Sequence, residues 1–132
     1  NTSRTQTSGA DLSEIKYTLP ANWTAKISGD SLMITPTGGG YLSIKAYDYN
    51  GATGRREFYC QTVNYCTSST SHTAQNIGNI SGYMASGLDN SGGGSEYYGA
   101  NGNKFYIISS YNPPSPNEFE KNFQNVLNSL VF

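Results

Sequence analysis

Two cysteines and a single histidine are the side chains in this sequence best suited to chemistry. Cys60 and Cys66 are the only cysteines, and five residues separate them. This spacing matches no common zinc or redox motif. Two cysteines so close together in a chain rich in Asn and Ser favour a local disulfide formed in an oxidising compartment. The alternative interpretation is a pair of buried free thiols.

His72 is the only histidine of the chain. One histidine without other converging groups forms neither a metal cage nor a catalytic triad. Residues 67–76 are mostly Ser, Thr, Asn and Gln, and this composition predicts a loop with His72 as a solvated side chain. The sequence also has no recognisable nucleophile–base motif. We therefore expect a non-enzymatic protein that needs no cofactor.

Two acidic segments have the oxygen-rich, Gly-containing composition of calcium loops. They are Asp48–Gly51 and Asp89–Gly92. Neither segment has the ligand spacing of a twelve-residue calcium loop. Asx turns explain both segments without a metal, so we expect no metal site there.

Tyrosine supplies the best candidate for a binding surface. The chain has 11 tyrosines, and this side chain combines a rigid apolar ring with a polar tip, as sugar- or protein-binding surfaces need. The alternative is that these rings lie beneath a second helix or a loop. The candidate surface consists of Tyr41, Tyr47, Tyr49, Tyr97 and Tyr106.

Charge argues against nucleic acid as a partner. The formal net charge is -1 and only 13% of the residues are charged. Such a chain has no broad electrostatic attraction for nucleic acid or anionic lipid. A DNA-uptake function would need a basic stripe built from Arg4, Lys45, Arg55, Arg56 and Lys104.

The clearest predicted element is a C-terminal amphipathic helix. Pro116 follows Ser115, a good N-cap residue, and Glu118 stands at the third helical position. The pattern predicts a helix from about 116 to 130 that packs on a sheet, with Phe105 and Ile107 of a preceding strand as the receiving face. The buried stripe of this helix is predicted to be Phe119, Phe123, Val126, Leu127 and Leu130.

The rest of the chain reads as a series of β-hairpins. Alternating residues predict strands at 31–35, 41–47 and 104–111, and Asn101-Gly102 is a strong turn signal. Residues 55–63 fit either a strand or a short helix. We predict an α+β fold in which an antiparallel sheet is covered by the C-terminal helix. We expect residues 15–132 to form one domain and residues 1–14 to be a polar linker or merely the edge of the sequence.

Two segments resemble the PsbP/Mog1-like family. They are Tyr17–Trp23, with its aromatic-x-x-Pro-x-x-Trp pattern, and Phe119–Phe132, while the strand at 104–109 stands where that family places its last strand. The resemblance covers about residues 15–132. It implies an α/β/α sandwich around an antiparallel sheet and a non-catalytic role in binding or assembly. The helix that the family usually has after its first hairpins would fall near 55–63, and this sequence departs from the family in having its cysteines there.

The polar start, the Ser/Thr/Asn/Gly-rich composition and the expected disulfide also resemble the ectodomain of a type IV pilin or minor pilin. We expect a non-enzymatic, extracellular interaction or assembly module of a bacterial cell-surface protein. Its partners would be protein subunits or a surface ligand, either protein or glycan, and it would meet a membrane only through an N-terminal anchor outside this sequence. The alternatives are a secreted hydrolase and a carbohydrate-binding domain.

Overall fold

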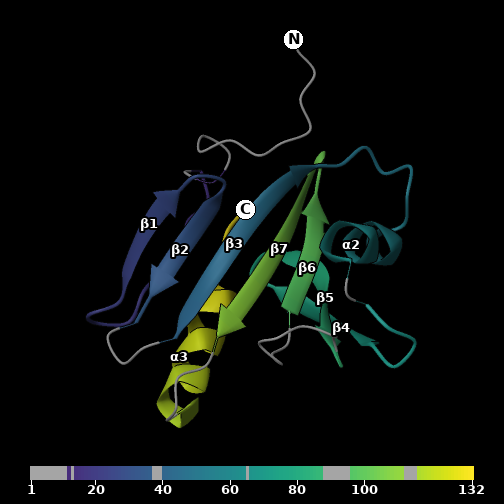
Figure 1. Ribbon diagram of the computed structural model, residues 1–132. Coiled ribbons are helices and arrows are strands. Elements are labelled where there is room, and N and C mark those ends of the chain that lie inside the picture. The colour runs from purple at the N-terminus through teal and green to yellow at the C-terminus, as the bar shows by residue number, and fades with distance from the viewer. Residues whose placement is uncertain (1–11, 13, 37–39, 65, 88–95, 112–115) are drawn as a thin grey trace.

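The computed structural model describes residues 12, 14–36, 40–64, 66–87, 96–111 and 116–132, and for residues 111 and 116–120 the backbone alone. These residues form an α+β fold with a seven-stranded antiparallel sheet and two helices (Figure 1). In chain order the elements are β1 (Thr24–Ser28), β2 (Ser31–Thr35), β3 (Tyr41–Asp48), α2 (Arg55–Val63), β4 (Ser71–Ile77), β5 (Ile80–Ser86), β6 (Glu96–Asn101), β7 (Lys104–Tyr111) and α3 (Pro116–Ser129).

The sheet joins two meanders, β1–β2–β3 and β4–β5–β6–β7, and every neighbouring pair is antiparallel. The strand order is β1-β2-β3-β7-β6-β5-β4, so β3 and β7 pair at the centre although they are far apart in sequence. The predicted hairpin at Asn101-Gly102 is confirmed, with one adjustment. Asn101 pairs with Lys104 as the last residue of β6, and Gly102, at φ 63°, turns the chain.

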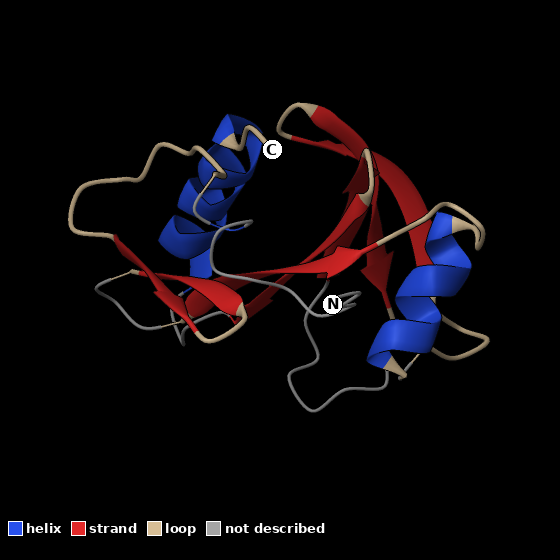
Figure 2. Ribbon diagram, turned by 90° about the horizontal axis from the view of Figure 1, so that it is seen from above, coloured by secondary structure: helices blue, strands red, loops and turns tan. Residues whose placement is uncertain are grey.

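Alternation along β7 divides the core into two clusters. Tyr106 and Ile108 belong to the cluster that contains the α3 side chains, whereas Phe105 and Ile107 belong to the cluster that contains Tyr59 of α2. The prediction that Phe105 and Ile107 receive the C-terminal helix was therefore wrong, because their side chains point to the other face of the sheet. Figure 2 shows the two helices on opposite sides of the sheet.

The C-terminal helix agrees with its predicted range and buries most of its predicted stripe. Its apolar residues join the cluster of Leu42 and Ile44 from β3, and the rings of Phe123 and Tyr97 lie 5.6 Å apart. The side chain of Phe119 lies outside the described residues. The buried members of the stripe are Phe123, Val126, Leu127 and Leu130.

The N-terminal end of the described chain contributes to the same core. Leu12 is only 1% exposed, and it packs in the cluster with Ile15. The prediction of a polar linker over residues 1–14 was therefore wrong at Leu12, an apolar side chain that the sheet and α3 remove from water. Lys16 forms an isolated antiparallel bridge with Val131, which ties this end of the chain to the C-terminus.

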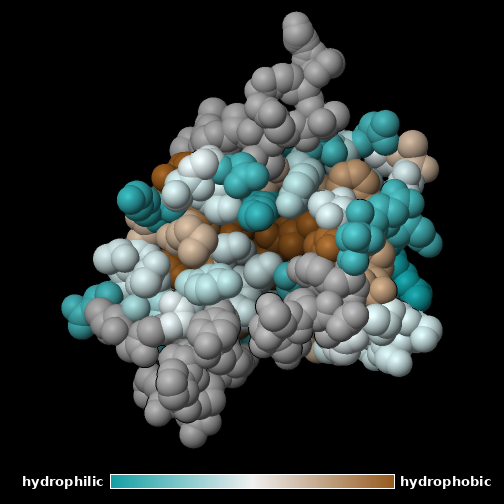
Figure 3. Space-filling model, in the orientation of Figure 1, coloured by the Kyte–Doolittle hydropathy of each residue, from teal (hydrophilic) through white to brown (hydrophobic). Residues whose placement is uncertain are grey.

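The segment 55–63, which the sequence left undecided, is helix α2. Its buried side chain is Tyr59, and Phe58 and Val63 pack beside it. The helix ends where Asn64 adopts a left-handed conformation at φ 63° and its N–H donates to the carbonyl of Cys60. On the face of the molecule that carries α2, hydrophobic residues gather at the centre and hydrophilic residues surround them (Figure 3).

The predicted loop over residues 67–76 was wrong, because most of it lies in strand β4. This strand pairs with β5 in continuous register from Ser71 opposite Ser86 to Ile77 opposite Ile80. Its composition is polar because β4 is an edge strand whose side chains are largely exposed, with Ile77 as the buried exception. Pairing with β5 therefore orders this segment, although its side-chain pattern does not predict a strand.

Candidate functional site

The first candidate site is the disulfide at the end of α2. Cys60 stands in the last turn of the helix and Cys66 follows it, and the structure joins them with a Cα–Cα distance of 5.5 Å. The sequence predicted this pairing. Both residues are half-buried, so the sulfur atoms lie at the edge of the α2 cluster rather than deep inside it.

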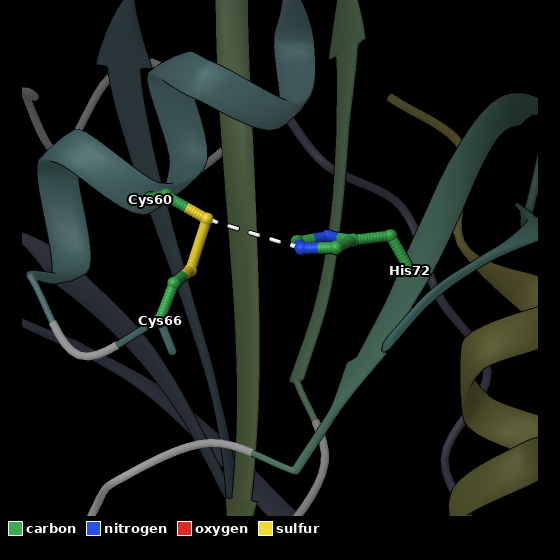
Figure 4. A group of neighbouring side chains, drawn as sticks. All are labelled: Cys60, Cys66 and His72. Atoms are coloured by element: carbon green, nitrogen blue, oxygen red, sulfur yellow. Dashed lines mark hydrogen bonds between the residues drawn. A yellow bond between two sulfur atoms is a disulfide. The ribbon is translucent and has the colours of Figure 1, made fainter. Parts of the chain in front are cut away.

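His72 lies beside this disulfide rather than in a solvated loop. Its Nε2 atom is 4.0 Å from Sγ of Cys60 (Figure 4). Its Nδ1 atom is 2.7 Å from the hydroxyl oxygen of Tyr98. The position follows from the β4–β5–β6 ladder, which places a half-buried β4 side chain beneath the end of α2. The sequence missed this contact because β4 has too polar a composition to reveal a strand.

Stacked aromatic rings support the histidine. The ring of Tyr98 is fully buried and lies parallel to that of Tyr59, with centroids 4.2 Å apart and an interplanar angle of 8°. Tyr83 also stacks with Tyr98, with centroids 5.4 Å apart, and the guanidinium of Arg55 lies 5.0 Å from the centroid of the Tyr83 ring. These contacts fix the hydroxyl group that meets His72.

A buried carboxylate completes the polar network under α2. Glu96 is 6% exposed, and its two oxygens accept hydrogen bonds from the hydroxyl groups of Tyr59 at 2.6 Å and Ser109 at 2.7 Å. A buried carboxylate without such donors would be costly. Nothing in the sequence distinguishes Glu96 from the other acidic residues, since its partners come from α2 and β7.

Burial favours the neutral forms of His72 and Tyr98. Desolvation lowers the pKa of His72, and the nearby Arg56 lowers it further against an opposing contribution from Glu57. Desolvation also raises the pKa of Tyr98, to about 12, with a further contribution from Tyr83. Both groups are therefore neutral near pH 7, and the hydrogen bond between them joins two uncharged side chains.

The second candidate site is a cavity where β3 leaves the sheet and meets α2. Its volume is about 490 Å³, and its lining combines two aromatic rings with one carboxylate and two amides. The Tyr49 and Phe58 rings meet edge to face at 5.0 Å, and Lys104 pairs with Asp48 at 2.8 Å. The lining residues are Asp48, Tyr49, Asn50, Phe58 and Asn103.

The walls of this cavity are held in place by the backbone. The N–H of Tyr49 donates to the carbonyl of Asn103 at 2.9 Å, and the Tyr49 hydroxyl donates to the carbonyl of Thr53 at 2.5 Å. The side-chain oxygen of Asn50 accepts from the N–H of Ala52, which is the predicted Asx turn. The second predicted acidic loop, at Asp89, lies outside the described residues.

The five candidate tyrosines do not form one exposed surface. Tyr97 and Tyr106 are only 4% and 6% exposed and pack in the cluster that contains α3, so that prediction was wrong for these two. Tyr47 and Tyr49 are half-buried on the α2 side, and Tyr41 is 39% exposed. Tyr97 and Tyr106 therefore lie on the α3 side of the sheet, whereas Tyr47 and Tyr49 lie on the α2 side. Successive residues of a strand face opposite sides of the sheet, so tyrosines on different strands need not share a face.

Two members of the candidate basic stripe have partners within the domain. Arg55 donates hydrogen bonds to the carbonyl of Ser81 and to the hydroxyl of Tyr83, and Lys104 pairs with Asp48. Arg4 lies outside the described residues. Among the described His, Cys, Asp and Glu side chains, the group close enough to hold a metal ion is Cys60, Cys66 and His72.

Comparison with protein-family models, with curated proteins and with solved structures finds no match. Within the described part of the chain, none of the helices has both the length and the apolar character needed to cross a membrane.

Proposed function

We propose that this domain is a non-enzymatic interaction module of a bacterial cell-surface protein, and that it binds a glycan in the Asp48–Tyr49 cavity. The observation that carries the proposal is the lining of the cavity, in which aromatic rings and planar polar side chains converge. Ligand sites are concave and mostly apolar, with a few polar groups that fix orientation. An extracytoplasmic location is supported by the Cys60–Cys66 disulfide, a bond typical of oxidising compartments.

The chemistry of the lining favours a sugar over an apolar ligand. An aromatic ring offers a flat apolar surface to the C–H groups of a sugar, while carboxylates and amides exchange hydrogen bonds with its hydroxyl groups. Asp48 supplies an acceptor, and Asn50 and Asn103 supply amides. The hydrogen bonds that the Tyr49 N–H and hydroxyl donate to backbone carbonyls preorganise the site, which reduces the entropy lost on binding.

A hydrolase is disfavoured by the same residues. Glycoside hydrolysis generally uses two carboxyl groups on either side of the scissile bond, about 5–10 Å apart. Asp48 is the only carboxylate among the described residues that line this cavity, and it is paired with Lys104. Cys60 and Cys66 are joined in a disulfide and so offer no thiolate to act as a nucleophile.

We also propose that the fold is a PsbP/Mog1-like sandwich in which α3 covers one face of the sheet and α2 the other. Support comes from the two clusters, since Phe123, Val126 and Leu127 pack with one set of sheet residues and Tyr59 with the other. Further support comes from α2, which occupies residues 55–63, where the resemblance implies a helix. This family mostly serves binding and assembly, which agrees with the proposed function.

The proposed function is tested by titrating isotope-labelled protein with a panel of oligosaccharides from bacterial cell walls and capsules. We expect at least one of them to shift the amide signals of Asp48, Asn50 and Asn103 while the saccharide stays intact. Binding that shifts only the amide signals of residues far from the cavity would show that the cavity is not the binding site. Progressive cleavage of the saccharide would reject the non-enzymatic assignment.

A further inference from the structure

We propose that reduction of the Cys60–Cys66 disulfide opens a site for a thiophilic d10 metal ion such as Zn²⁺, with Cys60, Cys66 and His72 as its protein ligands. The two sulfur atoms and one ring nitrogen of His72 all lie within 4.8 Å of one another. All three residues are half-buried, so an ion from solvent can reach them. Figure 4 shows the two cysteines at the end of α2 and the His72 ring pointing toward them from a strand. Thiolates and imidazole are the ligands that zinc prefers in proteins.

The geometry needs only a small adjustment. Zinc lies about 2.3 Å from sulfur and about 2.0–2.1 Å from nitrogen, so its tetrahedral ligand atoms are about 3.5–3.8 Å apart. The 4.0 Å between Nε2 of His72 and Sγ of Cys60 is already close to this spacing. The two sulfur atoms must separate once their bond is broken. Cys66 follows the left-handed end of α2 at Asn64, so it can move without unwinding the helix.

His72 is held in the orientation that a metal ligand requires. If Nδ1–H donates to the Tyr98 hydroxyl oxygen, 2.7 Å away, the lone pair of Nε2 faces the sulfur atoms. Metal-bound histidines almost always donate their second ring N–H in this way, and the partner fixes both the tautomer and the ring plane. The partner is itself rigid, because Tyr98 is buried and stacked on Tyr59.

The oxidation state of Cys60 and Cys66 decides whether this site can bind a metal ion. A dithiol reductant gives two electrons and two protons to the disulfide, breaks the S–S bond and forms two thiols, while the dithiol becomes a disulfide. Zn²⁺ then binds the two sulfur atoms as thiolates and releases their protons. With three protein ligands, the fourth tetrahedral position is open to water or to an exogenous ligand. The oxidised protein has no thiolates and does not bind the ion.

In the experiment, the protein is reduced with dithiothreitol, and the reductant is then removed under anaerobic conditions. Titration with Co²⁺ should give sulfur-to-cobalt charge-transfer absorption at one ion per chain, and Zn²⁺ should displace the cobalt. Oxidised protein should give no such absorption. His72→Asn keeps a side-chain nitrogen near Nδ1 but removes Nε2, and it should weaken Co²⁺ binding at least about tenfold. Tyr98→Phe should weaken binding by about tenfold without changing the stoichiometry.

Equal affinity of the reduced wild type and His72→Asn would overturn the proposal, because the two thiols alone would then explain binding. A stoichiometry of one ion per two chains would overturn it as well. If reduction by itself unfolds the chain, recovery of the far-ultraviolet circular dichroism with one equivalent of Zn²⁺ supports the site. Failure to recover with Zn²⁺ would count against it.

Discussion

The hydroxyl group of Tyr59 in α2 donates a 2.6 Å hydrogen bond to the carboxylate of Glu96 in β6. Both side chains are buried, and the second carboxylate oxygen accepts from Ser109. The bond links the short helix to the centre of the sheet. It also compensates for the burial of a carboxylate in a largely aromatic environment.

Tyr59→Phe should therefore destabilise the domain by about 1–3 kcal/mol, because one oxygen of Glu96 loses its donor while the ring packing is kept. Urea unfolding of the variant and the wild type measures the difference. Tyr17→Phe makes the same change in a half-buried tyrosine that packs on the other cluster, outside this network, and should change little. An equal loss of unfolding free energy in the two variants would mean that the Tyr59–Glu96 hydrogen bond stabilises the domain no more than the hydroxyl of the control tyrosine does.

The burial of α3 gives a second prediction. Phe123 is 2% exposed, and its replacement by Ala should cost about 3–5 kcal/mol through lost transfer energy and an unfilled cavity. Asn125 lies on the exposed side of the same helix, so Asn125→Ala should have a small effect. Urea midpoints that coincide for these two variants would show that the apolar stripe is not buried in solution.

The disulfide should be complete in protein isolated without reductant. Intact mass after alkylation should show two masked thiols, which become labelled only after reduction. The closed loop is short, so reduction should lower the free energy of unfolding by about 2 kcal/mol and leave the domain folded. Free labelling of Cys60 and Cys66 in native protein would contradict the bond seen in the structure.

Tyr47 predicts a loss of stability at alkaline pH. Desolvation raises its pKa above the ordinary value of 10.0, and the negative charges of Asp30 and Glu96 raise it further. The unfolded chain therefore releases this proton at a lower pH than the folded chain. The stabilising contribution is complete below pH 10.0 and is lost as pH rises through the folded pKa. The melting temperature of Tyr47→Phe should fall less over this pH range than that of the wild type.

The sequence predicted the elements whose side chains follow a strong period. The Phe/Leu stripe specified α3, the alternation of Leu42 and Ile44 specified β3, and Asn101-Gly102 specified a hairpin. It failed at β4, because an edge strand needs few apolar residues and owes its order to pairing with β5. It also assigned Phe105 and Ile107 to the wrong helix, since a period of two separates the faces without saying which helix lies on each.

The two candidate sites differed in how far the sequence could predict them. The Cys60–Cys66 pairing followed from close spacing, but the approach of His72 depends on tertiary register through β4, β5 and β6. In the cavity, Tyr49 and Asp48 were singled out separately, as a binding tyrosine and as part of an acidic loop. Phe58 and Asn103 join them only because β3, α2 and the β6–β7 turn meet at one place.

The proposed glycan-binding cavity is tested most directly by isothermal titration calorimetry on two matched variants. The ligand is an oligosaccharide that shifts the amide signals of the cavity residues. Asp48→Asn removes the carboxylate that lines the cavity, whereas Asp30→Asn makes the same change in the β1–β2 turn. The ion pair of Asp48 with Lys104 is partly exposed, so its loss should cost at most about 1 kcal/mol and leave the fold intact. We expect Asp48→Asn to weaken binding about tenfold or more, since charge-assisted hydrogen bonds are the stronger ones, and Asp30→Asn to bind like the wild type. Equal affinity of Asp48→Asn and the wild type would contradict the proposed site.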